Sequence, residues 1–283
     1  MIHELPLERR TLHGRWSRDF EPVLEIDPGD SVRFETLAVL WMRALDEPFC
    51  ERAADDGHAL SGPMFVRGAR AGATLSVRID EVEPGPWGVT FTSEPHRVVW
   101  DLADGVGRAS TGHEVTLAPF LGVIGMPPDE PGTHATRPPR PSGGNIDCKE
   151  LVAGTTLHLP IAVDGALLSA GDAHALQGDG EVSGTAIETT SCSQLTVDVC
   201  DDFRLDWPVA RVDDAWLTFG FDPDLDRAAD IALDGMVRLL GREHGLSPAD
   251  ALGLASVVVD LRVTQIVNQV KGVHAVLRDD ALQ

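Results

Sequence analysis

Short runs in which apolar and polar residues alternate recur through the first two thirds of the chain, and they constrain its fold more than any other feature. Residues 30–39 (DSVRFETLAV) and 73–82 (ATLSVRIDEV) show the alternation most clearly, and 87–93 (WGVTFTS) is a shorter example. Successive side chains of a strand point to opposite faces, so each run predicts a β-strand with one buried face. The glycines and prolines of residues 27–30 and 83–88 separate these runs and predict turns.

Two longer segments lack this alternation. Residues 40–63 are expected to contain a short helix ahead of the tight SGP corner. Residues 126–144 carry six prolines and no periodicity. Each proline removes a backbone donor, so this segment is predicted to be a loop rather than a central strand, a helix or a domain boundary.

Residues 155–172 and 181–200 each have the pattern of a pair of strands. Their turns are predicted at 163–166 (VDGA) and 190–194 (TSCSQ). The polar stretch 171–181 (GDAHALQGDGE) therefore connects two β regions, where side chains from several strand ends can converge.

The hydrophobic period changes near the end of the chain. Residues 224–245 place apolar side chains on one helical face, and Gly245 is positioned to end that helix. Ser247 and Asp250 then have the spacing of a capping box for a second helix, with a proline in its first turn. Residues 260–267 are expected to return as a strand. The residues of the first helical face are Leu225, Ala229, Ala232, Met236, Leu239 and Leu240.

Together these patterns predict a mainly β fold, with sandwich-like or barrel-like subdomains and a C-terminal α/β portion. The length of 283 residues is compatible with one domain. We therefore expect a single domain over 1–283, β-rich over 1–215 and composed of helices plus strand over 216–283.

The charge of the chain argues against two classes of partner. Acidic residues number 45 against 23 basic ones, a formal net charge of −22. Nucleic acids and anionic membrane surfaces both attract positive charge, so neither is an expected partner. No apolar run approaches the roughly 20 residues of a membrane span, and residues 1–16 lack the apolar stretch of a secretory signal. A cytoplasmic protein is expected.

The four cysteines show no zinc-finger spacing and are expected to be free, buried thiols: Cys50, Cys148, Cys192 and Cys200. Cys148 precedes a lysine and a glutamate, which leaves a nucleophilic thiol as an alternative. Neighbours in a strand point to opposite sides, however, so their adjacency is weak support for that alternative.

The stretch 171–181 is the main candidate for a functional site. Asp172 and His174 share one face of an extended segment, as Asn145 and Asp147 do in SGGNIDCKE. Glu181 follows after a loop long enough to bring its carboxylate over them. Carboxylates with one or two histidines suit zinc or a similar divalent ion, whereas the alternative is that the acids only cap turns. Isolated histidines beside glycine or proline are further candidates: His13, His58, His113 and His134.

Residues 141–188 closely resemble the acetamidase/formamidase family. The resemblance is carried by GGN-x-D, by P-x-x-V-x-G-A-L and by GD-x-H-x-x-QGDGE, and it extends to 58–79 and 260–268. It implies an oligomeric, mainly β enzyme that hydrolyses small amides to ammonia and a carboxylate. Two features depart from the family pattern: residue 59 is alanine where many relatives have proline, and the segment ARAGATL also differs. Both departures bear on which substrate is expected. The implied polar core comprises His58, Asn145, Asp147, Asp172, His174, Gln177 and Glu181.

The chemistry of these side chains suggests roles within that core. Asp147, His174 and His58 are assigned to a divalent metal, zinc by preference and calcium as an alternative. Glu181 would act as general base, Asn145 would donate to the oxyanion, and Asp172 would orient the histidine. Gln177 and Gly144 are assigned to substrate binding.

Several alternatives remain open at this point. One alternative substrate is another amide such as a lactam, and a further alternative is a non-enzymatic β protein that uses the same cluster to bind calcium. A metal-free mechanism would rely on Glu181 with a lysine or a cysteine. A homodimer or higher homo-oligomer is expected in each enzymatic case.

Overall fold

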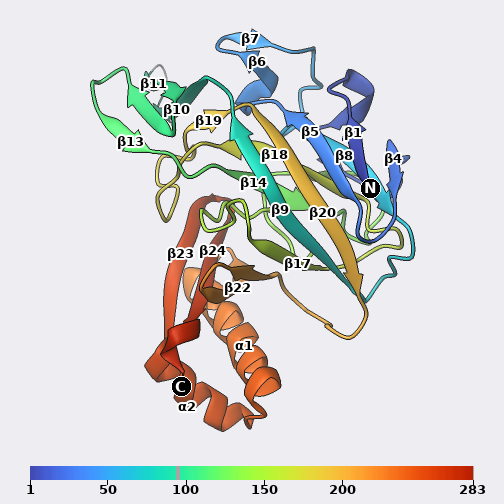
Figure 1. Ribbon diagram of the computed structural model, residues 1–283, viewed down its shortest axis with the longest axis vertical. Helices are drawn as coiled ribbons and strands as arrows, with labels where there is room; N and C mark the ends of the chain where they lie inside the picture. Colours follow the sequence, from blue (N-terminus) through green and yellow to red (C-terminus); the bar gives the residue numbers. More distant parts are fainter. Residues whose placement is uncertain (94–95, 283) are drawn as a thin grey trace.

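Two large β-sheets carry most of the chain in the computed structural model, which describes residues 1–93 and 96–282 (Figure 1). Within those residues one sheet has nine strands. Its first two strands are parallel to each other, and all its other neighbouring strands are antiparallel. Its strands in spatial order are β1 (Ile2–Leu5), β5 (Ser31–Thr36), β20 (Ser191–Cys200), β9 (Thr74–Pro84), β17 (Thr156–Pro160), β21 (Val209–Val212), β22 (Ala215–Asp222), β24 (Val270–Arg278) and β23 (Val259–Asn268).

The second large sheet has eleven strands among the described residues. Its main path is β13 (Glu114–Thr116), β12 (Val106–Ala109), β11 (His96–Ala103), β10 (Trp87–Ser93), β19 (Glu188–Thr189), β18 (Leu168–His174), β14 (Phe120–Gly125) and β16 (Gly143–Asn145). Three more strands branch from β18 through β8: β8 (Leu60–Val66), β2 (Leu12–His13) and β4 (Leu24–Ile26). Two small ribbons pair β3 (Arg15–Trp16) with β15 (His134–Ala135) and β6 (Met42–Ala44) with β7 (Glu47–Pro48).

The main hydrophobic core lies between the two large sheets. Phe34, Val77 and Leu195 of the nine-stranded sheet belong to the same buried cluster as Leu121 and Leu168 of the other sheet. The alternation in β5 and β9 places their apolar residues in this core, as the sequence predicts. The mainly β fold and the strands expected over 30–39, 73–82 and 87–93 are therefore confirmed.

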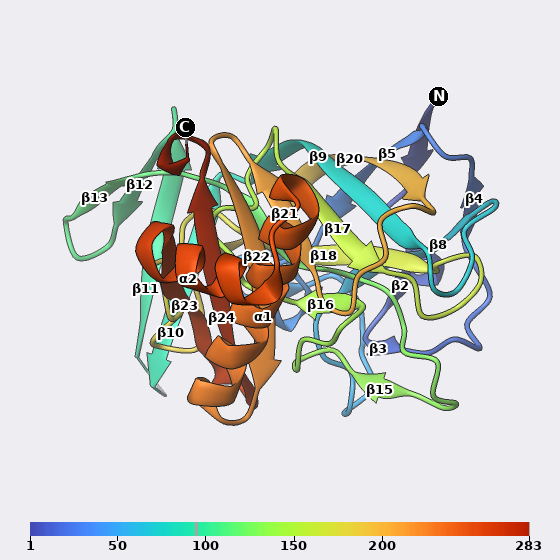
Figure 2. The same ribbon diagram turned by 90° about the horizontal axis from the view of Figure 1, so that it is seen from below.

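The C-terminal part adds two helices to the nine-stranded sheet, in front of β22 and β24 in Figure 2. α1 (Leu225–His244) begins at the cap Asp224, and Gly245 ends it in a left-handed conformation. α2 (Pro248–Val258) begins at Ser247, as expected. α1 approaches β22 closely: a Cβ on Gly220 would lie 2.1 Å from the carbonyl oxygen of Ala228. Strands that precede and follow residue 215 in the chain lie in the same nine-stranded sheet. The division of the domain into a β-rich part, 1–215, and a part of helices plus strand, 216–283, stays a prediction.

Three local predictions are corrected. In place of the expected α-helix, the segment 40–63 has the 3₁₀ turn η2 (Val39–Trp41), the β6–β7 ribbon and the first residues of β8. Leu40 and Trp41 have positive φ, and the buried Trp41 indole donates to the Gly57 carbonyl, so packing overrides helix formation there. The turn expected at 190–194 lies inside β20, where the hydroxyls of Ser191 and Ser193 are buried and bonded to each other.

The third correction concerns strand pairing. The chain does turn at 163–166, where the Ala166 N–H donates to the Val163 carbonyl. The strands that flank this turn, β17 and β18, belong to different sheets and do not form a hairpin. By contrast, residues 126–142 form a loop apart from the short β15, as their prolines predict. Among the described residues no helix is long and apolar enough to cross a membrane.

His13 gives the fold a pH dependence that can be measured. Its Nδ1–H donates to the Arg15 carbonyl and its Nε2 accepts from the Ser169 hydroxyl, at 2.6 and 2.9 Å. Burial lowers the pKa of His13 from 6.5 to about 4. The unfolded chain therefore binds a proton that the folded chain does not, and stability is lost as the pH falls from 6.5 towards about 4.

We expect His13→Gln to reduce the pH dependence of the free energy of unfolding over that interval, by the amount that corresponds to the uptake of about one proton on unfolding. Urea unfolding of both proteins across this pH interval measures how the free energy of unfolding depends on pH. The carboxylates are the same in both proteins, so their contribution cancels in the comparison. An unchanged slope would show that His13 carries its proton in the folded protein too.

Candidate active site

The predicted polar residues meet where β14, β16 and β18 lie side by side. β14 and β18 are buried along their whole length, and β14 pairs with both neighbours. Asp172 and His174 come from the end of β18, and Asp147 follows β16 by two residues. Five ionisable side chains gather there, each no more than 6% exposed: Asp147, Asp172, His174, Glu181 and Glu188.

Gly122 of β14 forms the floor of this cluster. A Cβ on Gly122 would lie 2.6 Å from Asp147 Oδ1, and 2.9 Å from both Asp172 Oδ2 and His174 Cε1. These three side chains therefore surround a small space that exists only because residue 122 has no side chain. Carboxylate oxygens and an imidazole facing one such space are donors that suit a divalent cation.

Hydrogen bonds fix the orientation of His174. Its Nδ1 lies 3.1 Å from Gln177 Oε1, and the amide nitrogen of Gln177 donates to the Asp147 carbonyl at 2.7 Å. The second contact orients the amide so that its oxygen accepts the Nδ1 proton. Nε2 then faces Asp172 Oδ2 and Glu188 Oε1, at 3.4 and 3.3 Å. In the neutral ring Nε2 keeps its lone pair, which is the form that binds a metal.

Asp147 has one oxygen occupied and one free. Asn268 of β23 donates its side-chain amide to Asp147 Oδ2 at 2.5 Å. Over the described residues, the other oxygen, Oδ1, has no hydrogen-bond partner, and neither has the buried Oδ1 of Asn145. Buried acceptors are rarely left without a partner, so these two atoms mark places where a ligand is needed.

Burial shifts the ionisation of the cluster strongly. It raises the pKa of Glu181 to about 9, with repulsion from Asp147 as the next cause, and it raises the pKa of Asp147 to about 7. Burial acts on Asp172 in the same direction, but His58 and His174 outweigh it and lower that pKa to about 2. Although burial lowers the pKa of His174, Glu188 and Asp172 raise it well above the usual value. The cluster thus holds more negative charge than its histidines balance.

Three of the acids have left-handed backbone. φ is 52° at Asp147, 59° at Asp172 and 46° at Glu181. This region is uncommon for residues other than glycine, and such strain is concentrated at functional sites. At Asp172 the irregularity also places the carboxylate above Gly122, between the regular β14–β18 pairs on either side.

The loop that carries Glu181 is fastened to the C-terminal part. The Gly180 N–H donates to the Thr264 carbonyl, and the Ile266 N–H donates to the Gly180 carbonyl. β23 therefore contributes both this anchor and Asn268. An open cavity of about 350 Å³ reaches Gln177 and Glu181 from the surface. A larger cavity of about 580 Å³, beside α1, contains none of the cluster residues.

His58 approaches the cluster from its edge. Its Nε2 lies 3.8 Å from Asp172 Oδ2, and its Nδ1 contacts the Thr136 hydroxyl at 2.9 Å. Thr136 belongs to the proline-rich loop, which thus supports the site. The remaining isolated histidines lie elsewhere: His13 bonds Ser169 and Arg15, His113 contacts Thr111, and His134 contacts the Glu130 carbonyl.

Gly144 lies in β16, paired with Ile124, next to Asn145. It is buried at φ 104°, which a side chain would strain. Its assignment to substrate binding, like that of Gln177, stays a prediction. Gln177 is the better defined of the two, because both ends of its amide are bonded within the cluster.

Sequence reasoning missed three members of the site: Gly122, Glu188 and Asn268. Glu188 contacts His174 because β19 pairs with β18 at that position. Gly122 and Asn268 likewise reach the cluster through pairing and packing between distant segments. The available signal was indirect, since Glu188 and Asn268 each end a segment that carries the family resemblance.

Cys148 faces away from the cluster. Its thiol is buried and donates to Glu150 Oε2 at 3.2 Å. Burial raises the pKa of this thiol well above its usual value, which is opposite to what an activated nucleophile needs. The arrangement favours carboxylate and imidazole chemistry over a thiol mechanism.

The chain resembles known proteins in sequence and in overall fold. The crystal structure of an acetamidase from Bacillus halodurans matches with a TM-score of 0.89 and 29% identity over 97% of both chains. An acetamidase from Yersinia enterocolitica matches with a TM-score of 0.91 and 25% identity, covering all of this chain and 93% of that one. The acetamidase of Mycolicibacterium smegmatis is 24% identical, and the match covers 60% of this chain and 61% of that protein.

The chain spans about three fifths of the length of the curated relatives it matches. The model of one protein family matches residues 3–131 and 130–213, which is well over half of the sequence. This chain therefore belongs to the Acetamidase/Formamidase family.

Proposed function

We propose that the protein hydrolyses the carbon–nitrogen bond of a small linear amide such as formamide or acetamide, releasing ammonia and a carboxylate. The observation that carries this proposal is the buried cluster around Gly122, in which acids and one oriented histidine face a space suited to a small polar group. Membership of the family supports the same reaction class.

We further propose that a divalent ion, zinc by preference, occupies the space beside Gly122. The free Oδ1 of Asp147 and Nε2 of His174 fit as ligands, and His58 can reach the same group of oxygens. Calcium fits less well, because it prefers six to eight oxygen ligands. When bound, such an ion supplies Lewis-acid chemistry, polarising a carbonyl and lowering the pKa of water.

The side chains of the protein account for the proton transfers. Glu181 would take a proton from the attacking water and return it to the nitrogen as ammonia leaves. A cation beside Asp147 would offset the repulsion that helps to raise the Glu181 pKa, and so favour the carboxylate form. Asn145 would donate its amide to the oxygen of the tetrahedral intermediate, and its own Oδ1 is buried without a hydrogen-bond partner among the described residues. Asp172 faces Nε2 of both histidines, 3.8 Å from that of His58 and 3.4 Å from that of His174.

Ammonia release tests the reaction class directly. We expect linear short-chain amides to be hydrolysed by the purified protein with release of ammonia. Lactam hydrolysis opens the ring and releases no ammonia, so it is followed as the amino acid formed, and turnover of only lactams would shift the assignment to the related cyclic substrates. Calcium binding without turnover of either class would favour the non-enzymatic alternative.

Glu181→Gln should reduce ammonia release by at least about 100-fold, since it removes the proton acceptor but keeps the size of the side chain. Asp179→Asn is the matched control: it changes a carboxylate two residues away, on the surface, and should alter turnover only a few-fold. Near-normal turnover by Glu181→Gln would remove this residue from the mechanism.

Gly122→Ala should lower both bound metal and turnover. The added methyl would occupy the space between Asp147, Asp172 and His174, and a displacement of about 1 Å can cost about 100-fold in rate. Metal content per chain, measured by mass spectrometry on protein purified without chelators, gives a readout independent of activity. Gly253→Ala, which adds a methyl in open space on α2, is the control. Normal metal content in the Gly122 variant would contradict this placement.

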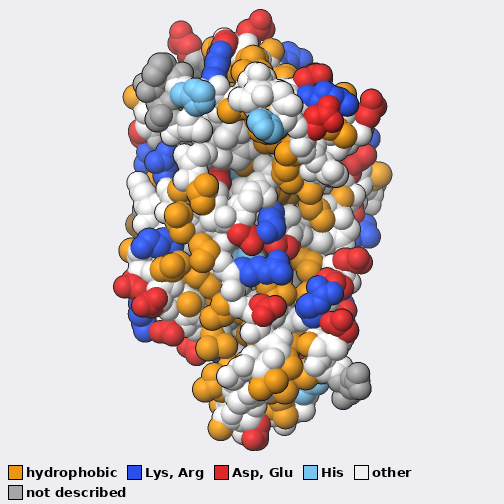
Figure 3. Space-filling model, turned by 90° about the vertical axis from the view of Figure 1, so that its left-hand side faces the viewer, with side chains coloured by type: hydrophobic (Ala, Val, Ile, Leu, Met, Phe, Trp, Pro, Cys, Tyr) orange, Lys and Arg blue, Asp and Glu red, His pale blue; other side chains and the backbone are white. Residues whose placement is uncertain are grey.

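We also propose that the protein forms a homodimer through the face that carries β23. This strand ends the nine-stranded sheet, and the exposed fractions of Val257 and Leu261 are 82% and 49%. Hydrophobic side chains gather on this side of the molecule in Figure 3. Gly180 bonds this strand only at Thr264 and Ile266, and the remaining edge of a terminal strand with apolar side chains is a surface that a second copy can pair with.

Light scattering measures the number of subunits. Val257→Asp combined with Leu261→Asp should give monomers, because the new charges would be buried in the dimer. Leu40→Asp, at an exposed hydrophobic position on η2, is the control and should keep the wild-type mass. A wild-type monomer would refute the dimer.

A further inference from the structure

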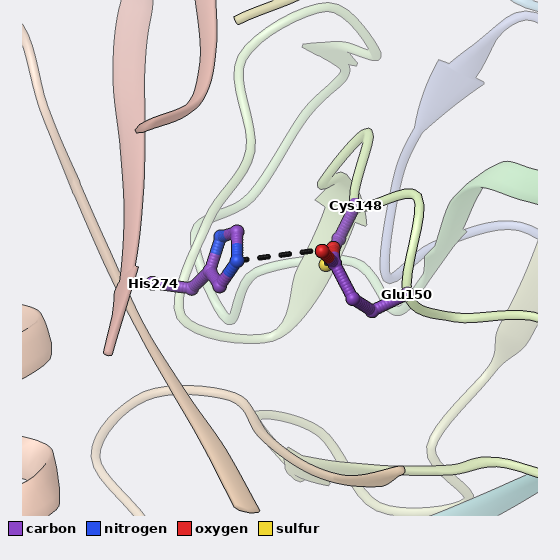
Figure 4. Close-up of side chains that lie close together, drawn as sticks. All are labelled: Cys148, Glu150 and His274. Atoms are coloured by element: carbon purple, nitrogen blue, oxygen red, sulfur yellow. Dashed lines mark hydrogen bonds and ion pairs between the residues drawn. The ribbon is translucent and has the colours of Figure 1, made fainter. Parts of the chain in front are cut away.

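A second cluster of metal-ligating side chains lies on the other side of the Asp147 segment. It consists of Cys148 and Glu150, which follow β16, and His274 of β24 (Figure 4). One donor atom from each residue lies within 4.8 Å of the others. None of these side chains belongs to the cluster around Gly122.

The separations match a tetrahedral metal site. Cys148 Sγ lies 3.2 Å from Glu150 Oε2, and His274 Nε2 lies 3.8 Å from the same oxygen. Zinc bonds of about 2.3 Å to sulfur and about 2.0–2.1 Å to nitrogen or oxygen place tetrahedral ligands about 3.3–3.6 Å apart. For these two pairs a shift of a few tenths of an ångström would complete the geometry, and the third pair, Sγ and Nε2, lies within 4.8 Å.

The histidine supplies an independent indication that a ligand belongs there. His274 is fully buried, and its Nδ1 bonds the Thr264 hydroxyl at 2.8 Å. Its Nε2 points towards Glu150, yet it has no hydrogen-bond partner in the part of the chain that is described. At 3.8 Å the carboxylate is too far to accept a hydrogen bond from this nitrogen. A metal ion between Nε2, Oε2 and Sγ would satisfy it.

Two basic side chains contact the other carboxylate oxygen of Glu150. Arg262 and Lys149 approach Oε1, at 3.2 and 3.6 Å. Oε2 is thus left to face the thiol and the imidazole. Glu150, Asp213 and Asp214 line an open cavity of about 510 Å³, which gives a cation an acidic route to the cluster.

We propose that Cys148, Glu150 and His274 form a second, structural site for a zinc-like divalent ion. Sulfur, nitrogen and oxygen donors together select zinc over magnesium or calcium. Binding displaces the thiol proton to solvent, and the thiolate becomes the ligand. The ion would tie the segment that carries Asp147 to the C-terminal hairpin.

Cobalt(II) is the probe that separates the two sites, because a cobalt–thiolate bond gives a near-ultraviolet charge-transfer band. The proposed active-site ligands include no sulfur, so cobalt bound there gives no such band. We expect the full-length protein loaded with cobalt to show the band. His174→Gln, which removes an active-site ligand, should keep it.

Cys148→Ser should abolish the band and lower the cobalt content by about one ion per chain. Cys192→Ser, at a free and partly buried cysteine, is the matched control and should retain both. Loss of a residue that only orients a metal ligand costs about 10–100-fold in metal affinity. His274→Gln removes a ligand itself, so it should weaken zinc binding at this site by more than that. Glu150→Gln provides a milder variant should either of these unfold, and circular dichroism checks the fold of each.

A band that persists in Cys148→Ser, or a wild-type protein that takes up cobalt without any thiolate band, would overturn the proposal. Neither outcome affects the amide-hydrolase assignment, which rests on ammonia release. Loss of ammonia release with an intact band would instead refute the proposed function and leave this second site standing.

Discussion

The structure is organised around the burial of charge inside a β-sheet. Four carboxylates and one imidazole lie within a few ångströms of each other with almost no contact with water. Removing such groups from water costs several kcal/mol each unless partners compensate. Partners do compensate in part: Asn268 donates to Asp147, and His58 and His174 neutralise Asp172. The remaining negative charge must be met by protons or by a cation.

The surrounding fold explains how such a cluster is held. β14 and β18 are buried on both faces, so their backbones form a rigid floor, and Gly122 leaves room above it. Left-handed backbone at Asp147, Asp172 and Glu181 is tolerated because neighbouring hydrogen bonds fix each residue. The Asp147 N–H donates to the Gly122 carbonyl, and the Gly178 carbonyl accepts from the Glu181 N–H. Strain in the backbone thus accompanies a cluster that is already oriented before substrate arrives.

Local sequence patterns predicted the mainly β fold and four of the five ionisable residues of the cluster. Period-two alternation predicted β5, β9 and β10, and the same period placed Asp172 beside His174. Glu188 and Asn268 were out of reach, because their contacts depend on which strands pair and at which register. The missed strand at 190–194 has a similar cause. Serines that favour turns locally are satisfied here by buried hydroxyl partners across the sheet, a long-range effect that no short window contains.

The segment from Asn145 to Glu150 connects the two parts of the molecule. Asp147 contacts the cluster around Gly122, whereas the neighbouring Cys148 lies beside Glu150 and His274 of β24. On the first side Gln177 and Asn268 hold Asp147, and on the second Glu150 is held by Arg262 of β23. The C-terminal hairpin therefore contacts the segment from both sides. A carboxylate that acts on a small substrate must be placed within fractions of an ångström. The C-terminal hairpin therefore contributes to the site through the position it gives Asp147.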